Sequence, residues 1–89
     1  SLYQIQVPVA SQSETDWQNG ISQAFSQILI KSSNDDKIIN QPAVKKALAQ
    51  AANYVDSYSY AAATDNKNGL MLAVQFYPQA IEQLLQSVG

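Results

Sequence analysis

The chain has 89 residues, a net charge of −2, 46% hydrophobic and 13% charged residues, and neither cysteine nor histidine. This composition predicts one globular domain, because it is too apolar for disorder and too short for a second core. The five basic residues are all lysines at scattered positions, which argues against a nucleic-acid interface and against a membrane-surface role. No run approaches the roughly 18 apolar residues of a membrane span, so we expect no direct membrane insertion of this segment.

The two ends suggest that residues 1–89 form a single α/β domain taken from a longer protein. Ser1 leads at once into a strand-like run, and Gly89 directly follows a helical pattern. No signal peptide is visible in this segment. The absence of cysteine excludes disulfides and leaves the redox compartment open.

The first half of the chain predicts one strand and two helices. Residues 2–9 alternate between an apolar face and a face that carries glutamines, as a half-buried strand requires. Ser11 and Ser13 are alternative N-caps of a helix whose apolar stripe runs to about residue 31. A polar loop follows, and a second helix is expected to begin near Pro42 and to carry its inner stripe as far as Val55.

The second half predicts two strands and a last helix. Residues 58–62 alternate in the manner of a strand, and Asn68 followed by Gly69 is a strong hairpin signal. Residues 70–77 then alternate as a more apolar third strand. Pro78 closes that strand and is suited to the first turn of a helix.

The predicted fold class is therefore α+β, with the order β-α-α-β-β-α. If the two helices form an antiparallel pair, the third strand runs parallel to the first and opposite to the second. This favours a three-stranded mixed sheet in the order 1-3-2 with the helices packed on one face, and the order 1-2-3 stays open. The shared core is predicted to contain Trp17, Phe25, Ile28, Leu48, Leu72, Val74 and Leu84. The other face of the sheet is predicted to carry Gln4, Gln6 and Gln75.

The sequence contains no motif for catalysis, for a cofactor or for a metal. Without histidine, a serine nucleophile lacks its usual base, and the isolated glycines form no phosphate-binding loop. The acidic loops at residues 35–36 and 65–66 lack the spacing of a calcium site and could hold at most a weakly bound cation. We expect neither an enzyme nor a cofactor.

Four segments invite comparison with a known family: residues 2–13 (LYQIQVPVASQS), 24–31 (AFSQILIK), 41–44 (QPAV) and 54–60 (YVDSYSY). Together they resemble the bacterial family called domain of unknown function 2066. The resemblance implies an exported protein of the periplasm or cell envelope of Gram-negative bacteria, and it brings no catalytic motif with it.

These observations favour a non-catalytic interaction domain of a bacterial cell-envelope protein, which binds a protein partner or another copy of itself. Residues 57–63 carry no charge and no proline, so in the order 1-3-2 this strand is an unguarded edge able to accept a strand from another chain. A Ser59→Pro exchange tests this idea if the Ser59 N–H points outward. The candidate interaction surface comprises Tyr54, Tyr58, Ser59, Tyr60, Gln4, Gln6 and Gln75.

A rival interpretation uses the same aromatic residues for a different ligand. Tyr54, Tyr58 and Tyr60 lie close together in the sequence and could stack on a small molecule or a glycan. Packing at the point where a helix runs into a strand is the commoner role of such a cluster. A pocket lined by all three exposed rings would favour the ligand-binding module.

Overall fold

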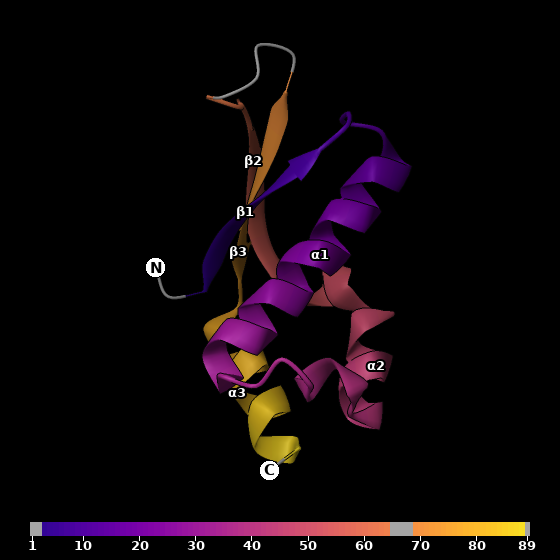
Figure 1. Cartoon of the computed structure of the whole chain (residues 1–89), viewed down its shortest axis with the longest axis vertical. Coiled ribbons are helices and arrows are strands. Elements are labelled where there is room, and N and C mark those ends of the chain that lie inside the picture. Colours follow the sequence, from indigo (N-terminus) through magenta and orange to yellow (C-terminus); the bar gives the residue numbers. More distant parts are fainter. Residues whose placement is uncertain (1–2, 65–68, 89) are drawn as a thin grey trace.

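The computed structural model describes residues 3–64 and 69–88 and has one sheet with three α-helices (Figure 1). The strands are β1 (Gln4–Val9), β2 (Val55–Ala62) and β3 (Leu70–Phe76). The helices are α1 (Glu14–Ser33), α2 (Pro42–Leu48) and α3 (Pro78–Ser87), and short 3₁₀ turns lie at Ile38–Asn40 and Ala51–Tyr54. The chain order is therefore β-α-α-β-β-α, as predicted. The hairpin signal at Asn68 lies outside the described residues.

The sheet has the predicted order β1-β3-β2, with the apolar strand β3 in the centre. Its pairing corrects the prediction of a mixed sheet, because β3 is antiparallel to both of its neighbours. The length of the connection explains the difference. Helix α1 returns along the sheet, but α2 has only seven residues, or about 10 Å, which is too short to carry the chain back. Strand β2 therefore starts at the same end of the sheet as β1.

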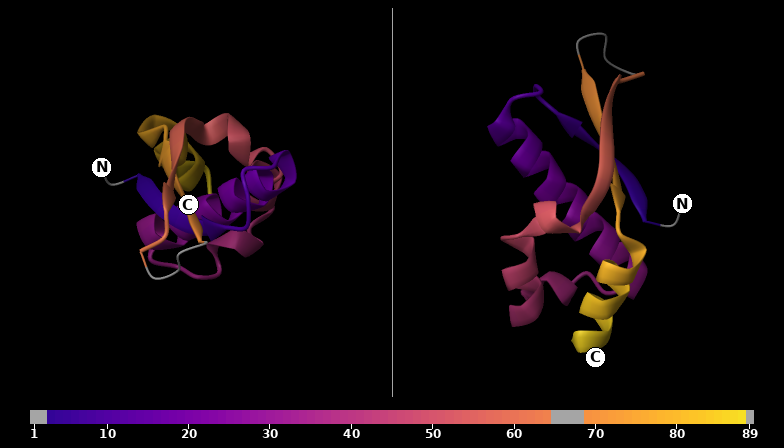
Figure 2. Two further views of the ribbon diagram at one scale, coloured as in Figure 1. Left: turned by 90° about the horizontal axis from the view of Figure 1, so that it is seen from above. Right: turned by 180° about the vertical axis from the view of Figure 1, so that it is seen from behind.

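Helix α1 covers one face of the sheet, whereas α2 and α3 do not share that face. Helix α1 packs mainly on β1 and more sparsely on β3, while α2 and α3 pack against α1 and against each other. Figure 1 and the right-hand view of Figure 2 show these two helices beyond one end of the sheet. The prediction of all helices on one face is corrected accordingly. No helix in the described part of the chain has both the length and the apolar character to cross a bilayer.

The start of α1 and its close approach to the sheet have local causes. Of the two predicted N-caps, Ser13 is the one used, since its Oγ accepts from the Asp16 N–H at 3.2 Å. About two turns after this N-cap, Gly20 is buried against the sheet, and a Cβ there would lie 2.7 Å from Val9 Cγ1 and 3.0 Å from Leu72 Cδ2. Because glycine has no side chain, α1 packs closer to β1 and β3 here than it could with any other residue.

The second helix is much shorter than its apolar stripe predicted. It ends at Leu48, and Val55 already belongs to β2, where it pairs with Phe76. Between them, the turn at Ala51–Tyr54 brings the Tyr54 ring to 4.6 Å from that of Phe25 and lets the Tyr54 carbonyl accept from the Tyr77 N–H at 2.9 Å. Packing against the core and pairing with β3 therefore overrode the local helical pattern.

The core lies between α1 and the sheet and continues toward α2 and α3. Phe25, Ile28, Leu72 and Val74 are fully buried, as predicted, whereas the other three predicted members pack against the core while remaining half-buried: Trp17, Leu48 and Leu84. Strand β3 alternates between buried positions and half-buried ones, so its predicted phase is confirmed. Directly before β1 begins, the Tyr3 hydroxyl donates to Glu82 Oε2 at 2.9 Å and links the sheet to α3.

The phase of β3 predicts opposite outcomes for two adjacent substitutions. Leu72→Ala removes a fully buried side chain and should lower the free energy of unfolding by about 2 to 5 kcal/mol. Met71→Ala, on the open face, should cost less than about 1 kcal/mol. Urea denaturation of the two variants measures both values, and an unchanged midpoint for Leu72→Ala would contradict the strand phase.

Candidate interaction edge and aromatic hollow

Strand β2 is an edge strand, and its hydrogen-bonding phase decides which groups it offers. The Ala63 N–H donates to the Gly69 carbonyl at 3.1 Å. In an antiparallel ladder, residues that bond to the neighbouring strand alternate with residues that face away. The continuous register from Ser57 to Ala62 therefore turns the N–H and C=O groups of three residues away from β3: Tyr58, Tyr60 and Ala62.

The same phase corrects the role predicted for Ser59. Ser59 lies opposite Ala73 and belongs to the bonded set, so its N–H points toward β3 and not outward. A proline at Ser59 would break the sheet itself. The informative position on this edge is Ala62, whose N–H faces away from β3 and whose side chain is small and exposed.

The two edges of the sheet differ in how well they are guarded. On β1, the Phe76 N–H donates to the Tyr3 carbonyl at 3.0 Å, which places Pro8 among the outward-facing positions, where it has no N–H to offer. On β2, the register breaks between Val55 and Ser57 and leaves Asp56 as a bulge. Beyond that bulge, no charge or proline interrupts the edge as far as residue 62. Strand β2 is therefore the more open edge.

The three predicted tyrosines do not line one pocket. The Tyr54 ring packs on Phe25 in the core, whereas Tyr58 and Tyr60 face the first turns of α1. There the ring of Trp17 lies 5.2 Å from that of Tyr58 at an angle of 57°, and Tyr60 lies 6.0 Å from Tyr58 at 86°. Trp17 thus takes the place that the sequence assigned to Tyr54.

An open hollow of about 410 Å³ lies over these rings, between the start of α1 and the middle of β2. We call it the aromatic hollow, and its lining residues are Gln12, Glu14, Trp17, Tyr58 and Tyr60. Tyr58 is 51% exposed, so its ring is available to a ligand. The indole Nε1 of Trp17 is buried and has no hydrogen-bond partner among the described residues.

One carboxylate, that of Glu14, lines the aromatic hollow, and together with Asp16 it affects the pKa of Tyr60. Partial removal from water raises the pKa of the Tyr60 hydroxyl above its ordinary 10.0, and the charges of Tyr58, Glu14 and Asp16 raise it further. Glu14 accepts from Gln18 Nε2 at 3.1 Å, and Asp16 accepts from Ser11 Oγ at 2.6 Å. Both carboxylates thus accept from neutral donors, and neither forms an ion pair with a lysine in the described part of the chain.

The glutamines predicted on the open face of the sheet do lie together on it. Gln4 is opposite Gln75, and Gln6 is opposite Ala73. Gln4 and Gln6 are exposed, while Gln75 is half-buried. This face is separate from the aromatic hollow, because Tyr58 and Tyr60 lie opposite Val74 and Leu72 on the α1 side of the sheet.

Other surface features of the described residues offer less to a ligand. A larger hollow of about 600 Å³ at the start of α3 is lined by Tyr77, Pro78, Gln79, Ala80 and Gln83 and holds no charged group. No group of three or more potential metal ligands occurs within residues 3–64 and 69–88. The acidic loop at residues 65–66 lies outside those ranges.

Fold and site together define a small α+β domain with an unguarded edge strand beside an aromatic, acidic hollow. The chain belongs to the family described as domain of unknown function (DUF8605), whose sequence profile matches residues 1–89. No curated protein and no solved structure shows significant similarity to the chain.

The family assignment overturns the expected resemblance to domain of unknown function 2066. The segments that suggested it have local explanations in the fold: Pro8 lies at an outward position of an edge strand, and the tyrosine-rich segment forms the second edge. Such patterns recur wherever strands need them, so they do not distinguish one family from another. The prediction of a periplasmic or cell-envelope location rested on that resemblance and gains no support from the family assignment.

The raised pKa of Tyr60 predicts a loss of stability in alkaline solution. The fold favours the neutral hydroxyl, so this contribution is fully present below pH 10 and is lost as the pH rises through the higher pKa of the folded state. Above pH 10, the thermal midpoint of the wild type should therefore fall more steeply than that of Tyr60→Phe. Parallel slopes for the two proteins would contradict the prediction. Tyr3, whose pKa is also raised, is present in both and cancels in the comparison.

Proposed function

We propose that this domain is a non-catalytic interaction module that binds an extended segment of a protein partner along the edge of β2. The observation that carries the proposal is the run of outward N–H and C=O groups at Tyr58, Tyr60 and Ala62 on a strand edge without charge or proline. Such an edge binds an added strand through main-chain hydrogen bonds, and neighbouring pockets select its side chains.

The position of α1 supports this function. Because α1 packs mainly on β1 and β3, it leaves part of the α1-side surface of β2 accessible, and Tyr58 is 51% exposed there. A strand added beside β2 would extend the sheet and place alternate side chains over the aromatic hollow. The partner would thus gain main-chain bonds and apolar burial at one site.

A glycan-binding function is less well supported by the same geometry. Flat sugar faces stack on exposed aromatic rings, but Trp17, Tyr58 and Tyr60 are strongly tilted relative to one another. Tyr54, the third ring of that hypothesis, is engaged with Phe25. The three rings of the hollow therefore present no shared flat platform for a sugar face.

The proposal predicts that blocking one outward N–H weakens strand binding without unfolding the domain. The probe is an eight-residue peptide of alternating threonine and valine with one central norleucine. It should slow the hydrogen exchange of the amides of Tyr58, Tyr60 and Ala62. Ala62→Pro removes one outward donor and should weaken binding at least about tenfold.

Ala62→Thr is the matched control, since it changes the side chain and keeps the N–H. It should bind the peptide like the wild type, and both variants should retain the wild-type circular dichroism spectrum. Two results would each refute strand addition: equal binding by Ala62→Pro, or binding that leaves the three amides unprotected.

A further inference from the structure

The aromatic hollow has a chemical preference that the strand edge alone does not have. Three aromatic rings meet there at angles of 57° and 86°, and the Glu14 carboxylate lines the same space. Ring faces carry negative partial charge and attract cations within about 6 Å of the ring centre. Rings and carboxylate therefore favour the same kind of occupant, one with a positive charge.

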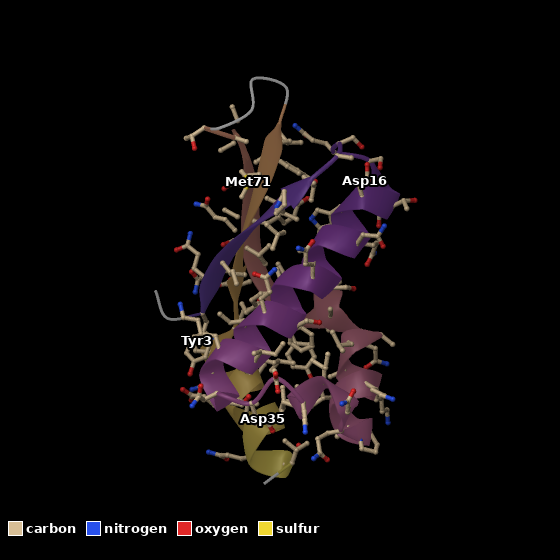
Figure 3. All side chains as sticks on the ribbon, viewed as in Figure 1. Tyr3, Asp16, Asp35 and Met71 are labelled. Atoms are coloured by element: carbon tan, nitrogen blue, oxygen red, sulfur yellow. The ribbon has the colours of Figure 1, made fainter. Side chains whose placement is uncertain are left out.

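Among the described residues, no lysine lies near the aromatic hollow to act as its cation. Glu14 and Asp16 lie in the first turn of α1, whereas the described lysines lie at residues 31–46, from the end of α1 onward. Figure 3 shows Asp16 in the same half of the molecule as Met71, and Asp35, next to those lysines in the sequence, in the opposite half. A cation for this hollow must therefore come from outside the described part of the chain.

We propose that the aromatic hollow binds a lysine side chain carried by the strand that adds to β2. This inference rests on the proposed function and specifies its partner. The apolar stem of lysine can lie along the crossed rings while its ammonium reaches the Glu14 carboxylate. An arginine is less suited, because a planar guanidinium stacks best on a flat aromatic face and these tilted rings provide none.

A second copy of this chain is a poorer occupant than a lysine-bearing partner. Its β2 strand, Val55–Ala62, contains no lysine, and its one charged residue is Asp56. Pairing two β2 edges would bring two sets of carboxylates together and would supply no cation. Like charges placed across an interface oppose association.

The experiment compares two peptides that differ in one side chain. Both have eight residues of alternating threonine and valine, and the central residue is lysine in one and norleucine in the other. The fluorescence of Trp17, the single tryptophan, reports binding at the hollow, and amide exchange of Tyr58, Tyr60 and Ala62 reports strand addition. At low ionic strength the lysine peptide should bind about tenfold more tightly, and the ratio should shrink as salt is added.

Variants of the hollow test which groups produce the preference. Glu14→Gln and Tyr58→Ala should each bring the affinity ratio of the two peptides close to one, while Tyr58→Phe, which keeps the ring, should preserve most of it. Amide protection along β2 should persist in all three variants. Glu82→Gln, a carboxylate change remote from the hollow, is the control and should leave the ratio unchanged.

The outcomes separate this inference from the proposed function. Equal affinities of the two peptides, with the β2 amides protected, would overturn the lysine site and leave strand addition standing. A lysine preference with unprotected amides would overturn strand addition and keep the lysine site. Binding of neither peptide would overturn both. A wild-type dimer in sedimentation that Ala62→Pro dissociates would identify a second copy as the occupant and refute the lysine-bearing partner.

Discussion

The contact between α1 and the sheet at Gly20 determines where the other elements can lie. Without a side chain at this position, the helix settles onto Val9 and Leu72 and covers β1 and β3. A helix and three twisted strands cannot all be in full contact, because one helix spans only about 10 Å. Strand β2 is left mostly uncovered, and α1 reaches it near Trp17, whose ring packs against Tyr58. The aromatic hollow follows from this packing, whereas the open edge follows from the sheet order β1-β3-β2.

The two edge strands of the sheet differ in whether their outward main-chain groups could accept another strand: β1 carries a proline there, and β2 does not. Pro8 lies at an outward position of β1, where its missing N–H costs the fold nothing and removes a donor that another chain could use. On β2, the bulge at Asp56 confines such protection to the beginning of the strand. The same small sheet thus has one edge strand that a proline protects and one that is largely unprotected. This contrast strengthens the case that the open part of β2 is available for strand addition.

Much of the fold could be predicted from periodicity, and the failures have physical causes. Alternation correctly predicts Leu72 and Val74 as core residues. The predicted order 1-3-2 is confirmed, although it rested on an antiparallel helix pair that would make β3 parallel to β1, and the two strands are antiparallel. The direction of β3 relative to β1 was wrong because it depended on the length of α2, and the stripe ending at Val55 did not reveal that the helix stops at Leu48. Only part of the aromatic hollow could be predicted from the sequence. Tyr58 and Tyr60 were recognised from spacing, but only the overhang of α1 brings Trp17 to them, and no local pattern encodes that overhang.

The edge of β2 and the aromatic hollow would determine different properties of an added strand. Main-chain hydrogen bonds are the same at every step along a strand, so an edge alone accepts many sequences and tolerates slippage by two residues. In the proposed strand addition, a side-chain site beside Tyr58 and Tyr60 would accept one side chain of the added strand and would therefore set its register. The carboxylates of Glu14 and Asp16 would act over a longer range and would favour approach of the strand in the orientation that brings its cation to the rings. On this account β2 supplies affinity, the rings supply register, and the acidic first turn of α1 supplies orientation, each from a separate part of the chain.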